Sequence, residues 1–437
     1  MTHIRRSFYR YINNHVIESF FLHRFMPGTG SWRSFSETLH SFENVQKTSS
    51  RKRVWFHAAS AGELESLWTV ITSCADLSFD LILTAFSPSA AKPMKRLCDE
   101  IVSRRGHLIY AGPCPWEGGW LNAFSILKPD IFVTTKYEAW PDLWMSLAEI
   151  KIPLFIVSAS ARNSIKFGKI SCRLLGSKIP RIIFFSTTKT EADVLRSMFK
   201  FSDIHVIGDP RWDRVKSRAV SSSNRAKILC KSFGALNRPI VIIGSAWLED
   251  MKQWKNNPPM IDGSLIIVPH HCDQASINEM QNFLSKSQLI ANHYGFIKSS
   301  DMSSNISGDP QTVPTGNHVI LVDEMGVLAE LYSLCDFAFI GGGFGKGVHS
   351  TIEPALHGIP IACGPARAKS FPEISELLSI GQLRIVKNSR QLAEWLKVGL
   401  NIDLSMREYW KNNISEKFGA TGRIINVIVQ KLKCEGL

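Results

Sequence analysis

The sequence predicts an α/β protein with two Rossmann-like halves. Short apolar segments of strand length alternate along most of the chain with stretches of helical or loop character. Strands that are apolar over their whole length are typical of parallel sheets covered by helices on both faces. A polar stretch with a serine run, residues 216–224, separates two sets of these segments, so we place a domain boundary near residue 220. With 437 residues and 44% hydrophobic content, the chain is long enough for two such domains.

The apolar segments predict the strands of each half in order. Those of the first half are Val54–Ala58, Leu81–Phe86, Ile131–Thr134, Leu154–Ser158, Ile182–Ser186 and His205–Ile207. Those of the second half are Ile240–Gly244, Ser264–Pro269, Val319–Val322, Phe337–Gly341, Ile359–Cys363 and Leu383–Val386. Residues 301–316, rich in Ser, Asn, Gly and Pro, are expected to form a surface loop. Ligands of doubly wound sheets bind beyond the carboxyl ends of the strands, so we expect a cleft where these ends of the two halves face each other.

Residues 1–50 are expected to form a basic arm ahead of the two halves. Residues 1–53 contain nine Lys or Arg and three acidic residues, and the whole chain has a formal charge of +13. This excess favours an anionic partner, which is nucleic acid, a membrane surface or an acidic substrate. Phe8, Ile12, Val16 and Phe20 recur at helical spacing, which predicts an amphipathic helix on a membrane surface or on the protein's own body. The arm lacks the uninterrupted apolar run of a membrane span and the cleavage site of a signal peptide.

The cysteine pattern indicates reduced thiols. Nine cysteines are scattered along the chain without a C-x-x-C pair, which argues against a disulfide framework and a zinc knuckle. The run His270-His271-Cys272-Asp273 has the composition of a metal site. However, adjacent residues at a strand end point in different directions and no partner motif accompanies them. We therefore expect no metal and no cofactor.

Residues 338–365 predict a phosphate-binding turn. They read as a strand, a glycine-rich turn, a helix that opens on Ser350 and Glu353, and another strand. The N–H groups and dipole at a helix N-terminus favour the phosphate of a nucleotide or sugar donor. Ser350-x-x-Glu353 fits a capping box, and Gly358 is suited to end the helix. Neither a Walker A loop nor a dinucleotide fingerprint fits the glycine spacing. The alternative is that the glycines only shape an ordinary αβ turn.

The strand ends also supply candidate catalytic residues. The first strand leads into Ser60-Ala61-Gly62-Glu63, where Glu63 is either a general base or a first-turn acid that stabilises the helix dipole. The third strand leads into Lys136-Tyr137-Glu138, and the sixth into a turn that carries Arg211. In the second half, Ser245-Ala246-Trp247, Pro269-His270-His271 and the turn at Met325-Gly326 follow strands in the same way.

Eight motifs then occur in the order seen in bacterial 3-deoxy-D-manno-octulosonic acid (Kdo) transferases. They are HAASAGE at 57–63, KYEAWPDL at 136–143, GDPRWDRV at 208–215, GSAWLED at 244–250, VPHH at 268–271, DEMGVLAELY at 323–332, GGGFGKGVHSTIEPALHGIPIACGP at 341–365 and GATGRI at 419–424. The chain resembles this family from about residue 50 to its C-terminus. The resemblance implies a GT-B glycosyltransferase with an acceptor-binding domain at 51–219 and a CMP-sugar-binding domain at 220–437, which includes the terminal helix. It also implies metal-independent transfer of Kdo from CMP-Kdo to a lipid A precursor, with inversion, at the cytoplasmic face of the inner membrane.

The same resemblance implies roles for individual residues. Glu63 falls on the catalytic base, and Lys136 and Arg211 fall on positions that stabilise the transition state. The CMP-binding positions are Pro269, His270, Met325, Gly326, Val327, Ser350, Thr351, Ile352 and Glu353. We expect further substrate contacts from Ser60, Gly62, Ser245, Gly342, Gly343 and His349. Many family members carry Glu at 136, Arg at 270 and Asn at 350, so this chain follows a variant of the pattern.

Two other functions fit parts of the sequence. Another GT-B enzyme would use a UDP-sugar on a lipid-linked acceptor, and only the order of the motifs favours CMP-Kdo over that donor. A nucleic-acid-binding protein would explain the basic charge, but the body of the chain contains no recognised nucleic-acid module. We therefore expect no specific nucleic acid partner.

Overall fold

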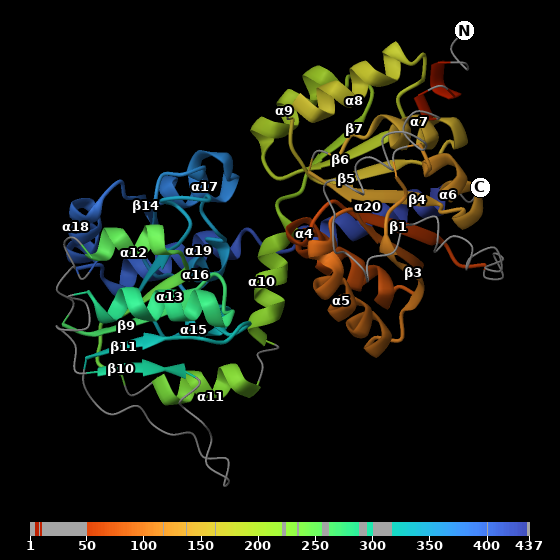
Figure 1. Cartoon of the computed structure of the whole chain (residues 1–437). Coiled ribbons are helices and arrows are strands. Elements are labelled where there is room, and N and C mark those ends of the chain that lie inside the picture. Colours follow the sequence, from red (N-terminus) through yellow and green to blue (C-terminus); the bar gives the residue numbers. More distant parts are fainter. Residues whose placement is uncertain are drawn as a thin grey trace. The chain divides into compact units, whose positions relative to one another are not determined.

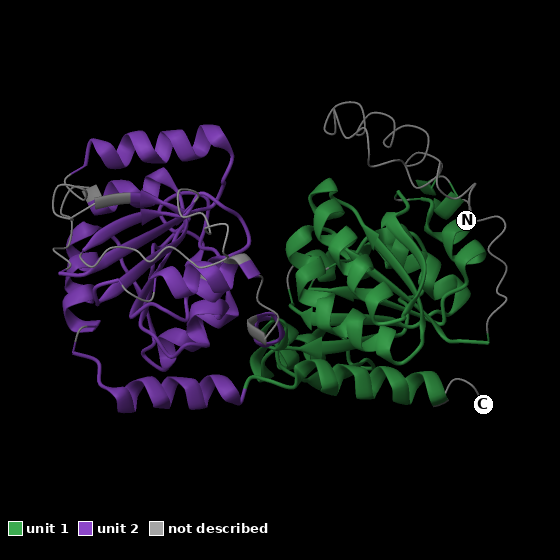
Figure 2. Cartoon of the chain, turned by 90° about the horizontal axis from the view of Figure 1, so that it is seen from below, with its two compact units in different colours: residues 1–214, 417–437 green, residues 215–416 purple. Residues whose placement is uncertain are grey.

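The computed structural model consists of two compact units, formed by Met1–Arg214 with Lys417–Leu437 and by Val215–Glu416 (Figure 2). It describes residues 5–7, 9–10, 50–116, 118–136, 138–161, 163–220, 224–233, 236–255, 262–287, 295–299, 317–399 and 401–434. The expected surface loop at 301–316 and most of the expected amphipathic arm lie outside the described residues. None of the helices within these ranges combines the length and apolar character that a membrane span requires.

The first unit contains a parallel seven-stranded sheet in the order β3-β2-β1-β4-β5-β6-β7 (Figure 1). Its strands are β1 (Arg53–Ala58), β2 (Asp80–Ala85), β3 (His107–Pro113), β4 (Ile131–Thr135), β5 (Leu154–Ala159), β6 (Ile182–Ser186) and β7 (Asp203–Val206). The six predicted strands are confirmed. The edge strand β3 was missed; most of its residues are only partly buried.

Helices cover both faces of this sheet. They are α4 (Ala61–Asp76), α5 (Ala91–Ser103), α6 (Trp120–Leu127), α7 (Pro141–Ile150), α8 (Asn163–Leu174), α9 (Lys189–Met198) and α20 (Ala420–Cys434). Alternate residues of β1 enter different cores, because successive side chains of a strand point to opposite faces. Val54 and Phe56 pack with α4, α5 and α20, whereas Trp55 packs with α6, α7 and α8.

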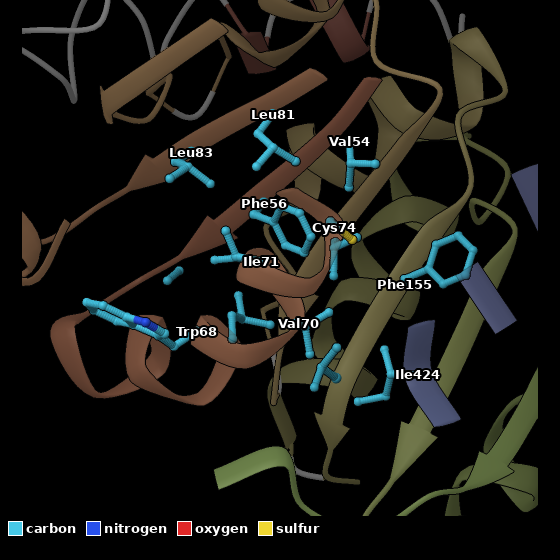
Figure 3. Packing of buried hydrophobic residues seen from close by; sticks show 14 of the residues in the cluster. Val54, Phe56, Trp68, Val70, Ile71, Cys74, Leu81, Leu83, Phe155 and Ile424 are labelled. Carbon is cyan, nitrogen blue, oxygen red and sulfur yellow. The ribbon is translucent and has the colours of Figure 1, made fainter. Parts of the chain in front are cut away.

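The last helix, α20, belongs to the first unit and not to the second half as the sequence prediction had it. Its residues Ile424, Ile428 and Leu432 recur at a spacing of four and are buried in the core that contains β1 and α4. Figure 3 shows Ile424 in this core together with Val70 and Phe155. The spacing identifies an amphipathic helix. It carries no information on which of two similar sheets the apolar face covers. The change from the first unit to the second falls within α10 (Pro210–Val220), at Arg214.

The second unit contains another parallel seven-stranded sheet, in the order β10-β11-β9-β8-β12-β13-β14. Its strands are β8 (Ile240–Ala246), β9 (Ser264–Pro269), β10 (Gly295–Lys298), β11 (His318–Leu321), β12 (Phe337–Ile340), β13 (Ile361–Cys363) and β14 (Leu383–Ile385). Its helices are α11 (Asn224–Phe233), α12 (Leu248–Lys255), α13 (Gln274–Ser285), α15 (Leu328–Leu331), α16 (Ile352–Ala355), α17 (Pro372–Ser379), α18 (Ser389–Gly399) and α19 (Leu404–Ser415). The six predicted strands are again confirmed, and the short edge strand β10 was missed. The predicted fold class is therefore confirmed for both sheets.

Candidate active site

Glu63 lies at the carboxyl end of β1, in the first turn of α4. Ser60 is the N-cap residue with an extended backbone (φ −148°), and a Cβ added at Gly62 would meet nothing within 4 Å. The Glu63 side chain is buried, and its Oε2 accepts a hydrogen bond of 2.7 Å from the Ala59 amide. Glu63 is thus an acid in the first turn of α4, one of the two roles that the sequence left open.

The electrostatic environment of Glu63 also suits a general base. Burial raises the pKa of its carboxyl, and this effect outweighs the nearby charge of Lys136 and the amides of Ala59 and Ser60, which lower the pKa. A carboxylate is a more effective base when its pKa moves toward neutrality. The position in the first turn of the helix and the role of a base are thus compatible in one side chain.

Lys136 follows β4 in a backbone conformation that is rare for residues with a side chain. Its φ is +63°, in the left-handed region, which costs on the order of 1 kcal/mol. Two backbone hydrogen bonds to the next strand hold this conformation, one of 2.7 Å from the Lys136 amide to Val157 O and one of 3.2 Å from the Ser160 amide to Lys136 O. Such strain persists only where the surrounding structure imposes it, and it is common at functional sites.

Glu138 is a further member of this cluster that the sequence prediction did not include among the site residues. The side chain is 7% exposed, and its Oε2 accepts a hydrogen bond from the indole of Trp140. Burial and the negative charge of Glu63 raise the pKa of Glu138 to about 7. The sequence offered one indication, the position of Glu138 two residues after Lys136, but burial beside a second carboxylate becomes visible only in the fold.

Arg211 lies at the start of α10, in the first unit. Its Nε and Nη2 donate to Asp209 Oδ2 at 2.9 and 2.6 Å, and its amide donates to Asp209 Oδ1 at 3.0 Å. The guanidinium is thus oriented by a carboxylate of its own turn. The three predicted catalytic residues all belong to the first unit.

In the second unit, the glycine-rich turn after β12 is shaped by close backbone approaches. A Cβ at Gly341 would lie 2.2 Å from Ser245 O, one at Gly342 would lie 2.2 Å from Gly347 O, and one at Gly343 would lie 2.4 Å from Gly364 N. No L-residue with a side chain fits these positions without displacing backbone. The three successive glycines therefore have a structural reason of their own.

The carboxylate of Asp250 occupies amides of this turn. The side chain accepts hydrogen bonds of 2.7 Å from Gly342 N, 3.3 Å from Phe344 N and 3.0 Å from Trp247 N. Asp250 is fully buried, and burial raises the pKa of its carboxyl while these amides lower it. Phosphate binding by this turn stays a prediction. The amides of Gly342 and Phe344 are hydrogen-bonded to a carboxyl group of the protein itself.

The helix after the turn is shorter than the sequence prediction. Helix α16 spans only Ile352–Ala355, its N-cap is Thr351, and no side chain caps it, so the predicted capping box of Ser350 and Glu353 is wrong. The Glu353 carboxylate instead accepts a hydrogen bond of 3.3 Å from Arg218. A helix of one turn has few aligned peptide dipoles, so it contributes little field at its N-terminus. Gly358, at φ +63°, follows this helix.

Trp247, His270 and His349 form a stack of rings that no sequence pattern predicted. The imidazoles of His270 and His349 lie 4.1 Å apart between centroids, and the ring of Trp247 lies 4.8 Å from that of His270. Trp247 Nε1 donates to His349 Nε2 at 2.9 Å. Burial lowers the pKa of His349 to about 4 and also lowers the pKa of His270, with further lowering from neighbouring histidines. Both imidazoles are therefore neutral near pH 7.

The remaining donor candidates lie along the same edge of the second sheet. Strands β11, β9, β8 and β12 are consecutive in the sheet, so the residues that follow them lie along one edge. Ser245 has φ +52° at the end of β8, and Pro269 is the last residue of β9. After β11, Met325 is 70% exposed, Gly326 has φ +86°, and Val327 is buried as the N-cap of α15. The fold thus brings together residues that are far apart in the sequence.

The two units, each built on a parallel seven-stranded sheet covered by helices, have the GT-B architecture. A UDP-GlcNAc 2-epimerase from Neisseria meningitidis superimposes with a TM-score of 0.55 at 14% identity, covering 86% of this chain and 100% of that chain. A glycosyltransferase from Rickettsia africae superimposes with a TM-score of 0.52 at 12% identity, covering 88% of this chain and 100% of that chain. An epimerase shares the architecture, so the fold alone leaves the reaction open.

The amino-acid sequence is similar to that of one enzyme family over most of its length. Residues 33–214 match the family model of 3-deoxy-D-manno-octulosonic-acid transferase (kdotransferase) and form a domain of that family. A 3-deoxy-D-manno-octulosonic acid transferase from Aquifex aeolicus is 27% identical over 328 residues, which cover 71% of this chain and 76% of that protein. That alignment is longer than the family match, so the similarity extends into the second unit. The resemblance predicted from the eight motifs is confirmed.

Proposed function

We propose that the protein transfers Kdo from CMP-Kdo to a lipid A precursor, with inversion at the anomeric carbon and without a metal. The observation that carries the proposal is the buried Glu63 carboxyl with its raised pKa, beside Lys136, within the domain that matches the Kdo transferase family. A buried carboxylate whose pKa is raised above its ordinary value is suited to act as a general base.

The chemistry is a single displacement. A hydroxyl oxygen of the acceptor attacks the anomeric carbon of Kdo, and its proton passes to Glu63. The bond between that carbon and the phosphate oxygen breaks, and CMP leaves with the electron pair. One displacement at one carbon inverts its configuration. The donor carries negative charge on its phosphate and on the Kdo carboxylate, so we assign Lys136 and Arg211 to stabilising these charges in the transition state.

Glu138 has a supporting role in this proposal. Two carboxyls that interact in a buried site do not both ionise readily, so one holds a proton. Because the pKa of Glu138 is raised to about 7 in part by the charge of Glu63, Glu138 holds the proton below that pH. Glu63 is then the ionised member of the pair and is ready to accept the proton of the acceptor.

We assign donor binding to the edge of the second sheet. The neutral, stacked rings of Trp247, His270 and His349 offer flat surfaces, which favour a planar base such as cytosine. Ser245 and Gly326, both with a left-handed backbone, lie near the ends of β8 and β11, and we assign them to the same donor site. The acceptor is assigned to the first unit and the reaction to the cytoplasmic face of the inner membrane, in keeping with the formal charge of +13 and an anionic lipid partner.

The decisive test replaces the proposed base. Glu63→Gln keeps the size of the side chain and its acceptor oxygen for the Ala59 amide but removes the base. The assay supplies CMP-Kdo generated in situ and a tetraacylated lipid A precursor and measures the product by mass spectrometry. We expect transfer to fall by about 100-fold or more, since general-base catalysis contributes at least that factor, with CMP affinity nearly unchanged in calorimetry.

A matched control and the donor choice complete the test. Glu65→Gln changes a carboxylate two residues away that pairs with Arg214, and it should retain most of the transfer activity. Turnover of Glu63→Gln above about a tenth of the wild-type rate would contradict the role of the base. Product formation with a UDP-sugar but not with CMP-Kdo would establish the alternative GT-B function instead.

A further inference from the structure

Helix α8 presents apolar side chains outward from the first unit. Phe167, Ile170 and Leu174 are 60%, 52% and 69% exposed, and their spacing of three and four residues places them in one stripe along the helix. The opposite face of α8 packs against the core through Ile165 and Cys172. A surface helix normally directs polar side chains outward, so an exposed apolar stripe of this kind is unusual.

A basic stripe runs beside the apolar one. Lys166, Lys169 and Arg173 each precede a residue of the apolar stripe by one position, and α8 contains no Asp or Glu. Lys166 and Arg173 are exposed, whereas Lys169 donates to Met198 O and lies over the ring of Phe199. We call the surface formed by Lys166, Phe167, Ile170, Arg173 and Leu174 the α8 outer face.

Acidic groups around α8 are already engaged. Glu149 on the neighbouring helix α7 interacts with Arg10, and Asp142 accepts a hydrogen bond of 2.5 Å from Arg10 Nε. Glu191 on α9 accepts a hydrogen bond of 2.8 Å from the Ala161 amide. Asp193 pairs with Arg196 at 2.7 Å. These four carboxylates of neighbouring helices thus have partners other than Lys166 and Arg173.

The α8 outer face also lies next to the start of the basic arm. Arg6 Nη2 donates to Gly176 O at 2.9 Å, two residues beyond the end of α8, and Tyr9 packs against the same core as Ile165. Figure 1 shows α8 on the outside of the first unit, in the same unit as the N-terminal segment. The most basic part of the sequence therefore begins beside an exposed apolar stripe.

We propose that the α8 outer face binds the surface of an anionic lipid bilayer. Phe167, Ile170 and Leu174 would enter the boundary between headgroups and acyl chains, and Lys166 and Arg173 would lie against anionic headgroups. An apolar stripe combined with cations and no acids is the pattern of helices that lie in a membrane interface. The proposal extends the proposed function, which needs access to a lipid acceptor, but lipid binding by this face requires no transfer chemistry.

The test is co-sedimentation of the full chain with vesicles of phosphatidylcholine, alone or mixed with phosphatidylglycerol. The variant Phe167→Gln, Ile170→Gln and Leu174→Gln keeps good helix formers at exposed positions, so the fold should be retained. We expect its partition onto anionic vesicles to fall by about 100-fold, because three apolar side chains no longer leave water. The matched control carries Gln at Val398, Leu404 and Met406, which are 58%, 79% and 43% exposed in the second unit, and should bind like wild type.

A second variant tests the charge. Lys166→Gln with Arg173→Gln should weaken binding to anionic vesicles by about 10-fold or more, with less effect on neutral ones. Each cation near an anionic surface raises the affinity by about fivefold. The proposal is overturned if wild type does not bind the anionic vesicles, or if the apolar variant binds like wild type. It is also overturned if wild type self-associates through this face and the apolar variant loses only that association. The vesicles contain no acceptor, so a failure of Kdo transfer would leave the result unaffected.

Discussion

Glu138→Gln should make the first unit more stable at high pH. The raised pKa of Glu138, about 7 against an ordinary value of 4.5, means that the folded chain holds a proton that the unfolded chain releases. Between these values the folded state binds more protons, so wild-type stability falls as pH rises. Below about pH 4.5 both states are protonated and no penalty exists, whereas above pH 7 the penalty is complete.

The size of the effect follows from the shift. A difference of about 2.5 units at roughly 1.36 kcal/mol each is about 3 kcal/mol, and little of it is lost to solvent because the side chain is 7% exposed. Gln cannot ionise and still accepts a hydrogen bond from the indole of Trp140. We therefore expect Glu138→Gln to gain up to about 3 kcal/mol over wild type at pH 8 and less than about 1 kcal/mol near pH 5.

Hydrogen exchange measured by mass spectrometry localises this effect. Peptides that carry β4 and α7 report the opening free energy of the first unit, and comparing variant with wild type at the same pH cancels the intrinsic exchange rates. Glu279→Gln, which changes an exposed carboxylate on α13, is the matched control and should show no such trend. If the difference between Glu138→Gln and wild type were the same at pH 5 and pH 8, the carboxyl would not be desolvated and the reasoning about the Glu63–Glu138 pair would fail.

Other predictions concern the backbone and the N-terminal segment. Gly341→Ala places a methyl group 2.2 Å from Ser245 O and should destabilise the second unit by roughly 2 kcal/mol or more. In α20, a Cβ added at Gly422 meets nothing within 4 Å, so Gly422→Ala should stabilise the first unit by about 0.5 kcal/mol. Thermal unfolding compares the two variants, and equal effects would contradict the packing at Gly341. Arg10→Ala removes the partner of Asp142, whose side chain is fully buried, and should cost about 2–3 kcal/mol in urea unfolding. An unchanged midpoint would show that the start of the chain does not pack on α7.

The residues of the first strand end illustrate what could be predicted for the site. Ser60, Gly62 and Glu63 follow an apolar strand directly, so their place at the carboxyl end of β1 follows from sequence order alone. The proximity of Glu138 to Glu63 does not, because β1 and β4 are separated by more than seventy residues and become neighbours only through the sheet order. The raised pKa of Glu138 depends on that proximity and on burial.

The second unit shows the same division in its glycine-rich turn. The spacing of Gly341, Gly342 and Gly343 correctly indicated an unusual backbone, but it also suggested a phosphate cradle on a capped helix. The structure differs because Asp250 binds two of the amides and because α16 is a single turn. The first of these depends on a side chain that follows another strand, β8.

Local patterns in the sequence were sufficient for the parallel sheets, for all of their strands except the edge strands β3 and β10, and for the family resemblance. Apolar runs specify strands wherever both faces are buried, and short motifs specify strand ends. Tertiary structure alone decided that α20 covers the first sheet, that Trp247, His270 and His349 stack, and that α8 exposes its apolar stripe. Each of these depends on which surfaces meet, and an amphipathic pattern records that a face is apolar without recording what covers it.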